Sequence, residues 1–232
     1  MLFRSTLAVA PALYRVLPYD PLRDFAPLWS ITSSGLVVVV NPKVPATNLA
    51  EFIAYVKANP GKVAYASSGV GTTQHLAGEQ FKARTGVDLL HVPYKGGAPA
   101  SADLMAGHVQ VMFDSLTNVL GAVREGRLRT LAVLRAKRSA AMPDVPTAAE
   151  AGVKGVEQPG WIGLFAPSGT PADVVAKLTS TLTREMAEPE VAAKLSASGN
   201  DGPVAGAELG RRLAEDKALF AEIVKRAGIK PE

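Results

Sequence analysis

Short runs of β-prone residues alternate with segments of helical periodicity along most of this chain. The most strand-like stretch, Leu28 to Asn41, contains four consecutive valines at positions 37–40, a pattern typical of a strand covered on both faces. Helical periodicity begins after Asn48, and strand and helix segments alternate at least three times between residues 36 and 134. This alternation predicts an α/β fold with a parallel sheet and crossover helices.

Capping residues indicate where several of the helices begin and end. Ser, Thr and Asn at the position before a helix satisfy its first N–H groups, and glycine is favoured just after its last turn. Four signals of this kind are present: Asn48 with Glu51, Thr147 with Glu150 before a short helix ending at Gly152, Thr170 before a helix with Pro171 at its first position, and Gly228 after a long amphipathic helix from residue 206 to 227. A further helix is expected from Pro189 to Ser198.

The segment from Val63 to Gly86 predicts a strand, a glycine-rich turn and a helix that begins at Thr73. Two glycines permit a sharp bend, and a helix that starts directly after them offers unpaired N–H groups and the positive end of its dipole. The turn is therefore either a seat for a small carboxylate or a plain strand-to-helix turn with Thr72 or Thr73 as N-cap. Its residues are Ser67, Ser68, Gly69, Val70, Gly71 and Thr72.

Three polar residues, Ser68, Tyr94 and Asp114, follow predicted strands. Loops at the carboxyl ends of parallel strands line the ligand crevice of α/β sheets, so we expect these residues to converge. Asp114 either orients a ligand group or a water, or caps the helix that follows residue 113. Tyr94 and Lys95 either face the ligand or lie in an exposed loop.

The composition is that of a folded protein with an ample core. Of 232 residues, 47% are hydrophobic and 20% charged, and the net charge of +4 comes from scattered Lys and Arg. Because there is no basic run, nucleic-acid binding is not indicated, whereas a mildly positive field suits small anionic ligands. Cysteine is absent, which excludes a thiolate nucleophile and Cys-based metal sites. No apolar run has the length of a membrane span, and the first residues lack the features of a signal peptide.

The histidines do not predict a metal centre or a catalytic base. His75, His91 and His108 are not at ligand spacing, and no nucleophile accompanies them in a recognisable set. We expect structural hydrogen bonds at His75, which falls in the first turn of its helix. The sequence predicts no metal, no cofactor and no enzymatic activity.

Six segments, in order and in register, resemble the Bug-type solute-binding proteins of the tripartite tricarboxylate transporter family. Their order and spacing match across essentially the whole chain, although each segment alone is only a modest match. They are ALYRVLPYDPLRDFAPL (12–28), YASSGVGTTQHLAGEQF (65–81), HVPYKGGAPA (91–100), QVMFDSL (110–116), LAVLRAKRSAAMPDVPTAAEAG (131–152) and GLFAPSGTP (163–171).

The resemblance implies a two-lobed, type II periplasmic-binding-protein (Venus flytrap) fold. A small carboxylate, such as a dicarboxylate, an amino acid or an aromatic acid, would be held between the lobes, often through bridging waters. One lobe would span residues 32–158, and the other would combine 1–31 with 159–232. Trp161 and Phe165 are expected to pack at the hinge between them. The resemblance also implies a periplasmic location and membrane components of a tripartite transporter as partners.

The resemblance places ligand contacts in both lobes. Residues 67–72 would form the carboxylate seat of the second lobe with Asp114 at its rim, and Ser5 and Thr6 would be the contribution of the first lobe. The family's opening strand, ligand loop, helix and following strand have no counterpart before Met1. We therefore expect an incomplete first lobe, as a truncated reading frame or a misplaced start codon would produce.

Two other functions remain open from the sequence. A sensory module that passes its ligand-bound form to a signalling receptor would have an indistinguishable sequence. An enzyme acting on a carboxylate is disfavoured by the lack of a nucleophile, base and orienting group in a recognisable set.

Overall fold

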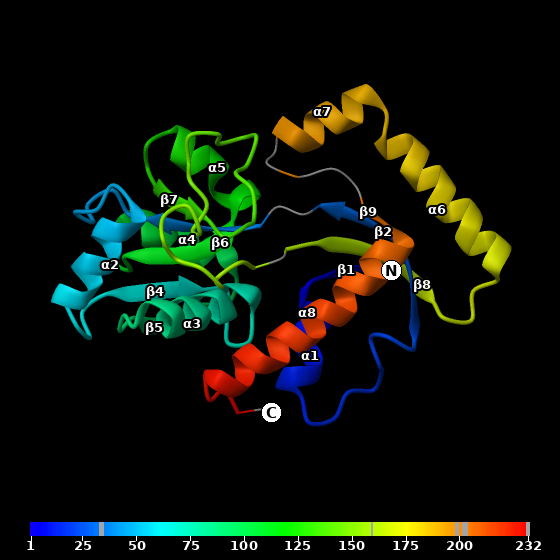
Figure 1. Ribbon diagram of the computed structural model, residues 1–232, viewed down its shortest axis with the longest axis horizontal. Coiled ribbons are helices and arrows are strands. Elements are labelled where there is room, and N and C mark those ends of the chain that lie inside the picture. The colour runs from blue at the N-terminus through cyan, green and yellow to red at the C-terminus, as the bar shows by residue number, and fades with distance from the viewer. Residues whose placement is uncertain (33–34, 159, 198–199, 201–203, 231–232) are drawn as a thin grey trace. The chain divides into compact units, whose positions relative to one another are not determined.

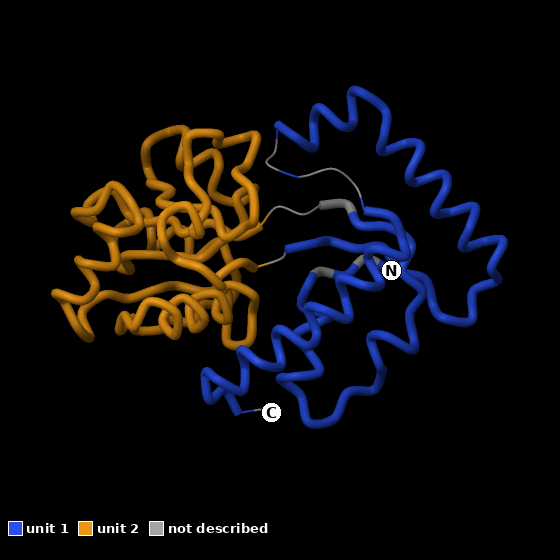
Figure 2. Tube along the Cα trace, viewed as in Figure 1, with its two compact units in different colours: residues 1–34, 159–232 blue, residues 35–158 orange. Residues whose placement is uncertain are grey.

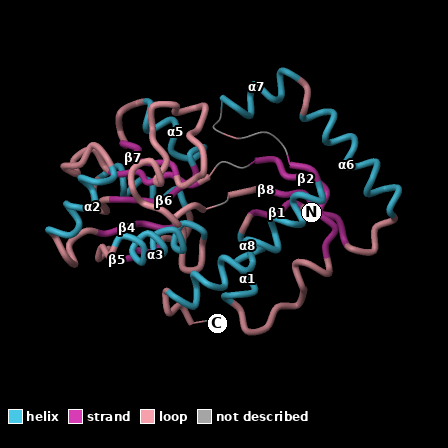
Figure 3. Tube along the Cα trace, viewed as in Figure 1, coloured by secondary structure: helices cyan, strands magenta, loops and turns pink. Residues whose placement is uncertain are grey.

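The computed structural model describes residues 1–32, 35–158, 160–197, 200 and 204–230 (Figure 1). The chain divides into two compact units, residues 1–34 with 159–232 and residues 35–158 (Figure 2). Each unit has its own sheet, with helices connecting the strands (Figure 3). The chain therefore passes twice from one unit to the other.

The unit of residues 35–158 contains a five-stranded sheet with the order β5-β4-β6-β3-β7. β4 pairs in parallel with both β5 and β6, whereas β3 is antiparallel to β6 and β7. The strands are β3 (Leu36–Val40), β4 (Ala64–Ser67), β5 (Leu90–Pro93), β6 (Val111–Ser115) and β7 (Arg129–Val133).

The expectation of a parallel sheet is wrong for β3. The chain enters this unit directly from the other one, without a crossover helix, at the edge where the remaining strands end. A strand that starts at that edge has to run in the opposite direction. The strand predicted from residue 28 to 41 corresponds to two strands, β2 (Phe25–Thr32) and β3, and residues 33–34 lie outside the described part of the chain.

Helices cover both faces of this sheet: α2 (Leu49–Ala58), α3 (Thr73–Thr85), α4 (Gly97–Ala106) and α5 (Leu116–Arg124). The four valines at positions 37–40 are all buried and alternate between the two faces, as the sequence predicts. Val38 and Val40 share a cluster with Phe52 of α2 and Phe81 of α3. The other two valines pack in a second cluster with residues of α4 and α5. Burial of both faces accounts for the uninterrupted β-branched run.

Most predicted caps are present. Asn48 accepts a hydrogen bond from Glu51 N at 2.9 Å, and α3 begins after Thr72 and ends at Gly86, which is left-handed. The prediction of a short helix before Gly152 is wrong. The expected capping contacts are nevertheless present, because Thr147 N donates to Glu150 Oε2 and Glu150 N donates to Thr147 Oγ1. This segment forms turns, because one helical turn does not offset its nucleation cost and Ala148 N donates to Val133 O of β7 instead.

The other unit has an antiparallel sheet in the order β1-β8-β2-β9, where the remaining strands are β1 (Leu2–Arg4), β8 (Ile162–Pro167) and β9 (Val204–Ala205). Its helices are α1 (Thr6–Leu13), α6 (Ala172–Met186), α7 (Pro189–Ala197) and α8 (Gly206–Arg226). The long C-terminal helix is confirmed, and Gly228 after it is left-handed. α6 starts one residue later than predicted, with Pro171 before it, and the expected end of α7 at Ser198 lies outside the described residues.

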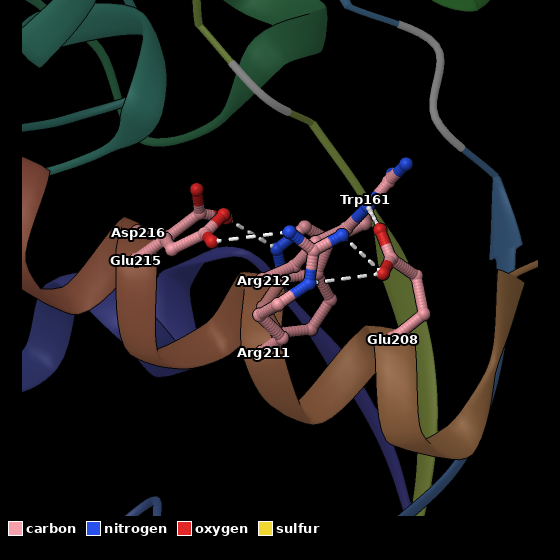
Figure 4. Close-up of polar contacts among 6 residues, drawn as sticks. All are labelled: Trp161, Glu208, Arg211, Arg212, Glu215 and Asp216. Atoms are coloured by element: carbon pink, nitrogen blue, oxygen red, sulfur yellow. Dashed lines mark hydrogen bonds and ion pairs between the residues drawn. The ribbon is translucent and has the colours of Figure 1, made fainter.

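A buried hydrogen bond joins α8 to the segment that leads into β8. Trp161 Nε1 donates to Asp216 Oδ2 at 2.7 Å, and both side chains are buried (Figure 4). The Trp161 and Phe165 rings lie 5.9 Å apart between centroids, so Trp161 is a packed core residue of this unit. Burial raises the pKa of Asp216 to about 6, although the Trp161 hydrogen bond and the charge of Arg212 act in the opposite direction.

We predict a pH-dependent effect of Asp216→Asn on stability. The pKa of Asp216 in the folded protein lies above its usual 3.8, so its favourable contribution is complete below pH 4 and is lost as the pH rises through 6. Asparagine keeps an acceptor for Trp161 and cannot ionise. Between pH 4 and 7.5, the unfolding free energy of the variant relative to the wild type should rise by about 2–3 kcal/mol. Urea titrations at both pH values measure this difference.

Glu222→Gln is the matched control, because Glu222 is an exposed carboxylate on the same helix, whereas the charge of Glu215 itself contributes to the raised pKa of Asp216. The difference in unfolding free energy between this control and the wild type should change far less between the two pH values than it does for Asp216→Asn. If the unfolding free energies of the two variants, each relative to the wild type, changed equally between the two pH values, the role assigned to the buried carboxyl group would be wrong.

Candidate functional site

The turn between β4 and α3 is held by its own hydrogen bonds. Gly69 and Gly71 have φ angles of 135° and 76°. Residues with a side chain rarely adopt such angles, so the turn requires glycine at both positions. Thr72 Oγ1 donates to Gly69 O at 2.8 Å and, as the N-cap of α3, accepts from His75 N. Ser67, at the end of β4, is fully buried and its Oγ lies 3.1 Å from Gly69 O.

Several N–H groups of this turn are already bound by side chains. Ser68 N donates to Gln74 Oε1 at 2.6 Å, and Gly71 N donates to His75 Nδ1 at 3.0 Å. Within the described residues, the backbone N–H groups of Val70, Thr73 and Gln74 donate no hydrogen bond. Val70 is 60% exposed, and the other two residues form the first positions of α3. These three N–H groups, together with the positive end of the helix dipole, make up a candidate anion seat.

Gln74 connects the turn to Asp114 at the end of β6. Its amide nitrogen donates to Asp114 Oδ1 at 2.5 Å, while its amide oxygen accepts from Ser68 N. The same carboxylate oxygen accepts from Ser115 N at 2.7 Å and from Asn118 Nδ2 at 3.0 Å. Asp114 thus fixes both the glycine turn and the first turn of α5. Gln74 was not a predicted site residue, and its place in the first turn after the glycines is the only sequence signal for it.

Two stacked imidazoles lie beneath the turn. The His75 and His91 ring centroids are 4.0 Å apart and the rings are nearly parallel, and the Tyr65 ring also stacks on His91, with 4.7 Å between centroids. His91 Nε2 lies 2.6 Å from Ser67 Oγ. Burial lowers the pKa of both imidazoles, that of His91 to about 4. Both are therefore neutral at neutral pH, and the hydrogen bond from Gly71 confirms the structural role expected for His75.

Tyr94 borders the turn with its backbone. Tyr94 N donates to Ser67 O at 2.9 Å, and its hydroxyl donates to Asp103 of α4 at 2.6 Å. Partial burial and this hydrogen bond raise the pKa of Tyr94 to about 12. Of the predicted site residues, the structure therefore brings together residues 67–72, Tyr94 and Asp114.

Ser5 and Thr6 belong to the other unit. Ser5 is buried at the N-cap position of α1, and its backbone N–H donates to Trp161 O at 3.1 Å. Thr6 is exposed in the first turn of that helix. In the described part of the chain, no three His, Cys, Asp or Glu side chains are placed to hold a metal ion. Nor does any described helix combine the length and apolar character needed to cross a bilayer.

A family model described as the tripartite tricarboxylate transporter family receptor, TctC, matches residues 1–229. The chain belongs to the TctC family. Protein BugT of Bordetella pertussis is 34% identical over 97% of this chain and 70% of its own length. A UPF0065 protein from the tcbD–tcbE intergenic region of Pseudomonas sp. strain P51 is 39% identical over 86% of this chain. The matched part of this TctC chain spans 60% of the Pseudomonas relative.

Solved structures confirm the two-lobed α/β fold of the TctC chain. Rhodopseudomonas palustris Rpa4515 with adipate superposes with a TM-score of 0.91 at 33% identity and covers all of this chain and 78% of its own. The periplasmic binding protein BugD gives a TM-score of 0.88 at 32% identity, with the same shares of the two chains. MatC from R. palustris with bound malate gives 0.83 at 29% identity, covering 96% of this chain and 78% of its own.

We predict that Gln74→Leu lowers the free energy of unfolding by about 1–3 kcal/mol, because it removes partners from two buried polar groups without creating a large cavity. Asn118→Ala removes only one of the donors to the same Asp114 oxygen and should cost less. Urea denaturation followed by circular dichroism measures both. An equal decrease in unfolding free energy for the two variants would show that the Gln74 bridge between the turn and Asp114 stabilises the protein no more than the single Asn118 hydrogen bond does.

Proposed function

We propose that this chain is a non-enzymatic receptor that binds a small organic carboxylate, in the periplasm, for a tripartite tricarboxylate-type uptake system. The observation that carries the proposal is the group of three N–H donors at Val70, Thr73 and Gln74, at the start of α3. Membership of the TctC family supports it, as do the structures of relatives with adipate and malate. The periplasmic location is supported by the relative described as a periplasmic binding protein.

The anion seat is suited to carboxylate binding because its geometry exists before the ligand arrives. Side chains of Gln74 and His75 hold neighbouring N–H groups of the turn, so the remaining donors are oriented in advance. Each contact of an anion with a helix N-terminus contributes about 0.3–1 kcal/mol when exposed, and more when water is excluded. Neutral His75 and His91 add no fixed charge, so the positive potential comes from backbone dipoles.

The pair of Ser67 and His91 does not favour hydrolytic chemistry. Although their side-chain atoms lie 2.6 Å apart, Ser67 is fully buried and its hydroxyl is also engaged with Gly69. A nucleophile needs access to its substrate, and the base beside it needs a pKa near the working pH. The low pKa of His91 and the burial of Ser67 fit a structural hydrogen bond instead.

A thermal-shift screen of small carboxylates tests the function directly. A ligand at about one hundred times its dissociation constant stabilises the folded state by about 2.7 kcal/mol, so a binding carboxylate should raise the melting temperature by several degrees. The corresponding neutral amide of each acid is the control, and it should give no shift. The absence of a shift for every carboxylate would overturn the proposed function.

We predict that Gly71→Asp abolishes measurable carboxylate binding in calorimetry, because it places a carboxylate in the anion seat. Gly86→Asp is the matched control. Gly86 is also left-handed, with a φ of 66°, and lies at the other end of α3, where a Cβ atom added to it would have no heavy atom within 4 Å. Both substitutions put a side chain at a positive φ angle, 76° at Gly71 and 66° at Gly86. Retained affinity in Gly71→Asp, or equal loss in both variants, would contradict the placement of the seat.

A further inference from the structure

The N–H group of Gly71 depends on an acceptor that can be protonated. Gly71 is buried in the turn between β4 and α3, and its N–H group donates to His75 Nδ1 at 3.0 Å. A ring nitrogen accepts a hydrogen bond only through its lone pair, so the proton of neutral His75 lies on Nε2. An imidazolium carries N–H groups at both positions. Protonation of His75 therefore replaces this hydrogen bond with a contact between two donors.

The neighbouring hydrogen bonds of the turn keep their acceptors in acid. Ser68 N donates to the amide oxygen of Gln74, which does not titrate. The Ser67 hydroxyl lies 2.6 Å from His91 Nε2, and a protonated His91 can donate from that nitrogen to the hydroxyl oxygen. Of the two histidines beneath the turn, His75 is thus the one whose protonation breaks a contact.

Titratable groups on four elements lie around His75. The His91 ring of β5 stacks on it with 4.0 Å between centroids, and the Tyr65 ring of β4 stacks on His91. Burial raises the pKa of Tyr65, which therefore stays neutral. Asp114 of β6 accepts a hydrogen bond from Gln74, the residue before His75 on α3. A charge placed on the buried imidazole pair is poorly solvated.

Charged groups on α3 modify this effect of burial. Burial lowers the pKa of His75, whereas the charge of Glu79 raises it and that of Lys82 lowers it. Glu79 and Lys82 are themselves paired at 2.9 Å. Burial and, next, the charge on His75 lower the pKa of His91 to about 4. The two imidazoles therefore titrate in order, and the first proton goes to His75.

We propose that the hydrogen bond from Gly71 to His75 is an acid-sensitive latch: protonation of His75 releases the Gly71 N–H group and opens the turn at this position. At neutral pH the latch is closed. Val70 and Thr73 lie within two residues of Gly71, so the orientation of their N–H groups depends on the same contact. The latch needs no ligand, and it stands or falls separately from the proposed function.

Amide hydrogen exchange of the wild type, followed by NMR at pH 7.5 and pH 4.5, tests the latch. Protection factors remove the intrinsic effect of pH on exchange and report how often an N–H group is open. A released His75 titrates near 6.5 and a latched one titrates lower, so the latch weakens as the pH falls. The protection of Gly71 N–H should fall about tenfold or more in acid.

Ser68 N–H is the internal control, because it belongs to the same turn and its acceptor on Gln74 does not titrate. Its protection should change by less than about twofold between the two pH values. An equal fall at Ser68 and Gly71, or no fall at Gly71, overturns the proposal.

Substitutions of the histidines identify the group that senses acid. His75→Asn places an amide oxygen near the position of Nδ1, so the acceptor remains and cannot be protonated, and the protection of Gly71 should become independent of pH. His108→Asn is the matched control, because His108 is exposed and pairs with Asp103 outside the turn. This control and His91→Gln should both keep the fall seen in the wild type. A fall that persists in His75→Asn, or disappears in His91→Gln, contradicts the assignment.

Nitrogen-15 chemical shifts of the wild-type imidazoles test the latch without any substitution. At pH 7.5, His75 Nδ1 should have the shift of an unprotonated nitrogen that accepts a hydrogen bond, and Nε2 should carry the proton. A proton on Nδ1 at this pH would show that Gly71 has no acceptor on His75, and the latch would be ruled out. Circular dichroism shows whether each variant is folded.

Discussion

A buried strand end that leads into a left-handed turn leaves backbone N–H groups that no ladder can satisfy, and each needs an acceptor inside the protein. In this chain two neighbouring residues of α3 supply those acceptors. Gln74 accepts from Ser68 N, and His75 accepts from Gly71 N. The helix that follows the turn therefore holds the turn in place, and the N–H groups that remain are oriented by the same contacts. The rest of the candidate site depends on this arrangement.

The same contacts decide the electrostatics of the site. Two histidines beneath the turn could have formed a cationic site, but burial disfavours the protonated form of both, and the neighbouring His75 disfavours that of His91 further. Asp114, with its carboxylate oxygen turned toward three donors, serves as a fixed acceptor for the first turn of α5 and for Gln74. The positive potential at the turn thus comes from the backbone dipoles of α3. The polar side chains of Gln74, His75 and Asp114 already make hydrogen bonds within the protein.

The direction of β3 determines which residues can take part. Because β3 enters the sheet from the edge where β4, β6 and β7 end, its first residue lies beside the loops that follow those strands. Gly35 at this point leaves space for the stem of Arg135, which a Cβ atom at position 35 would displace. A crossover helix before β3 would have placed the opposite end of the strand at this edge. The route of the chain into this unit therefore decides which end of β3 borders the loops of the candidate site.

The sequence by itself determined the elements whose signals are local. The four valines at positions 37–40, the Asn48 cap and the glycines that end α3 and α8 act within a few residues, and each formed as predicted. The order and spacing of six short sequence segments along the chain also sufficed to indicate the family. Short-range patterns succeed here because propensity, capping and alternation are properties of neighbouring residues.

Only the tertiary structure decided the direction of β3, the turn at Ala148 and the partners of Asp114. Each depends on hydrogen bonds between residues far apart in the chain, such as Ala148 N with Val133 O and Gln74 with Asp114. A glutamine in a first helical turn has no periodic or spacing signature. The significance of Gln74 arises because the ends of β4 and β6 share an edge, and that is fixed by sheet pairing, which local sequence does not encode.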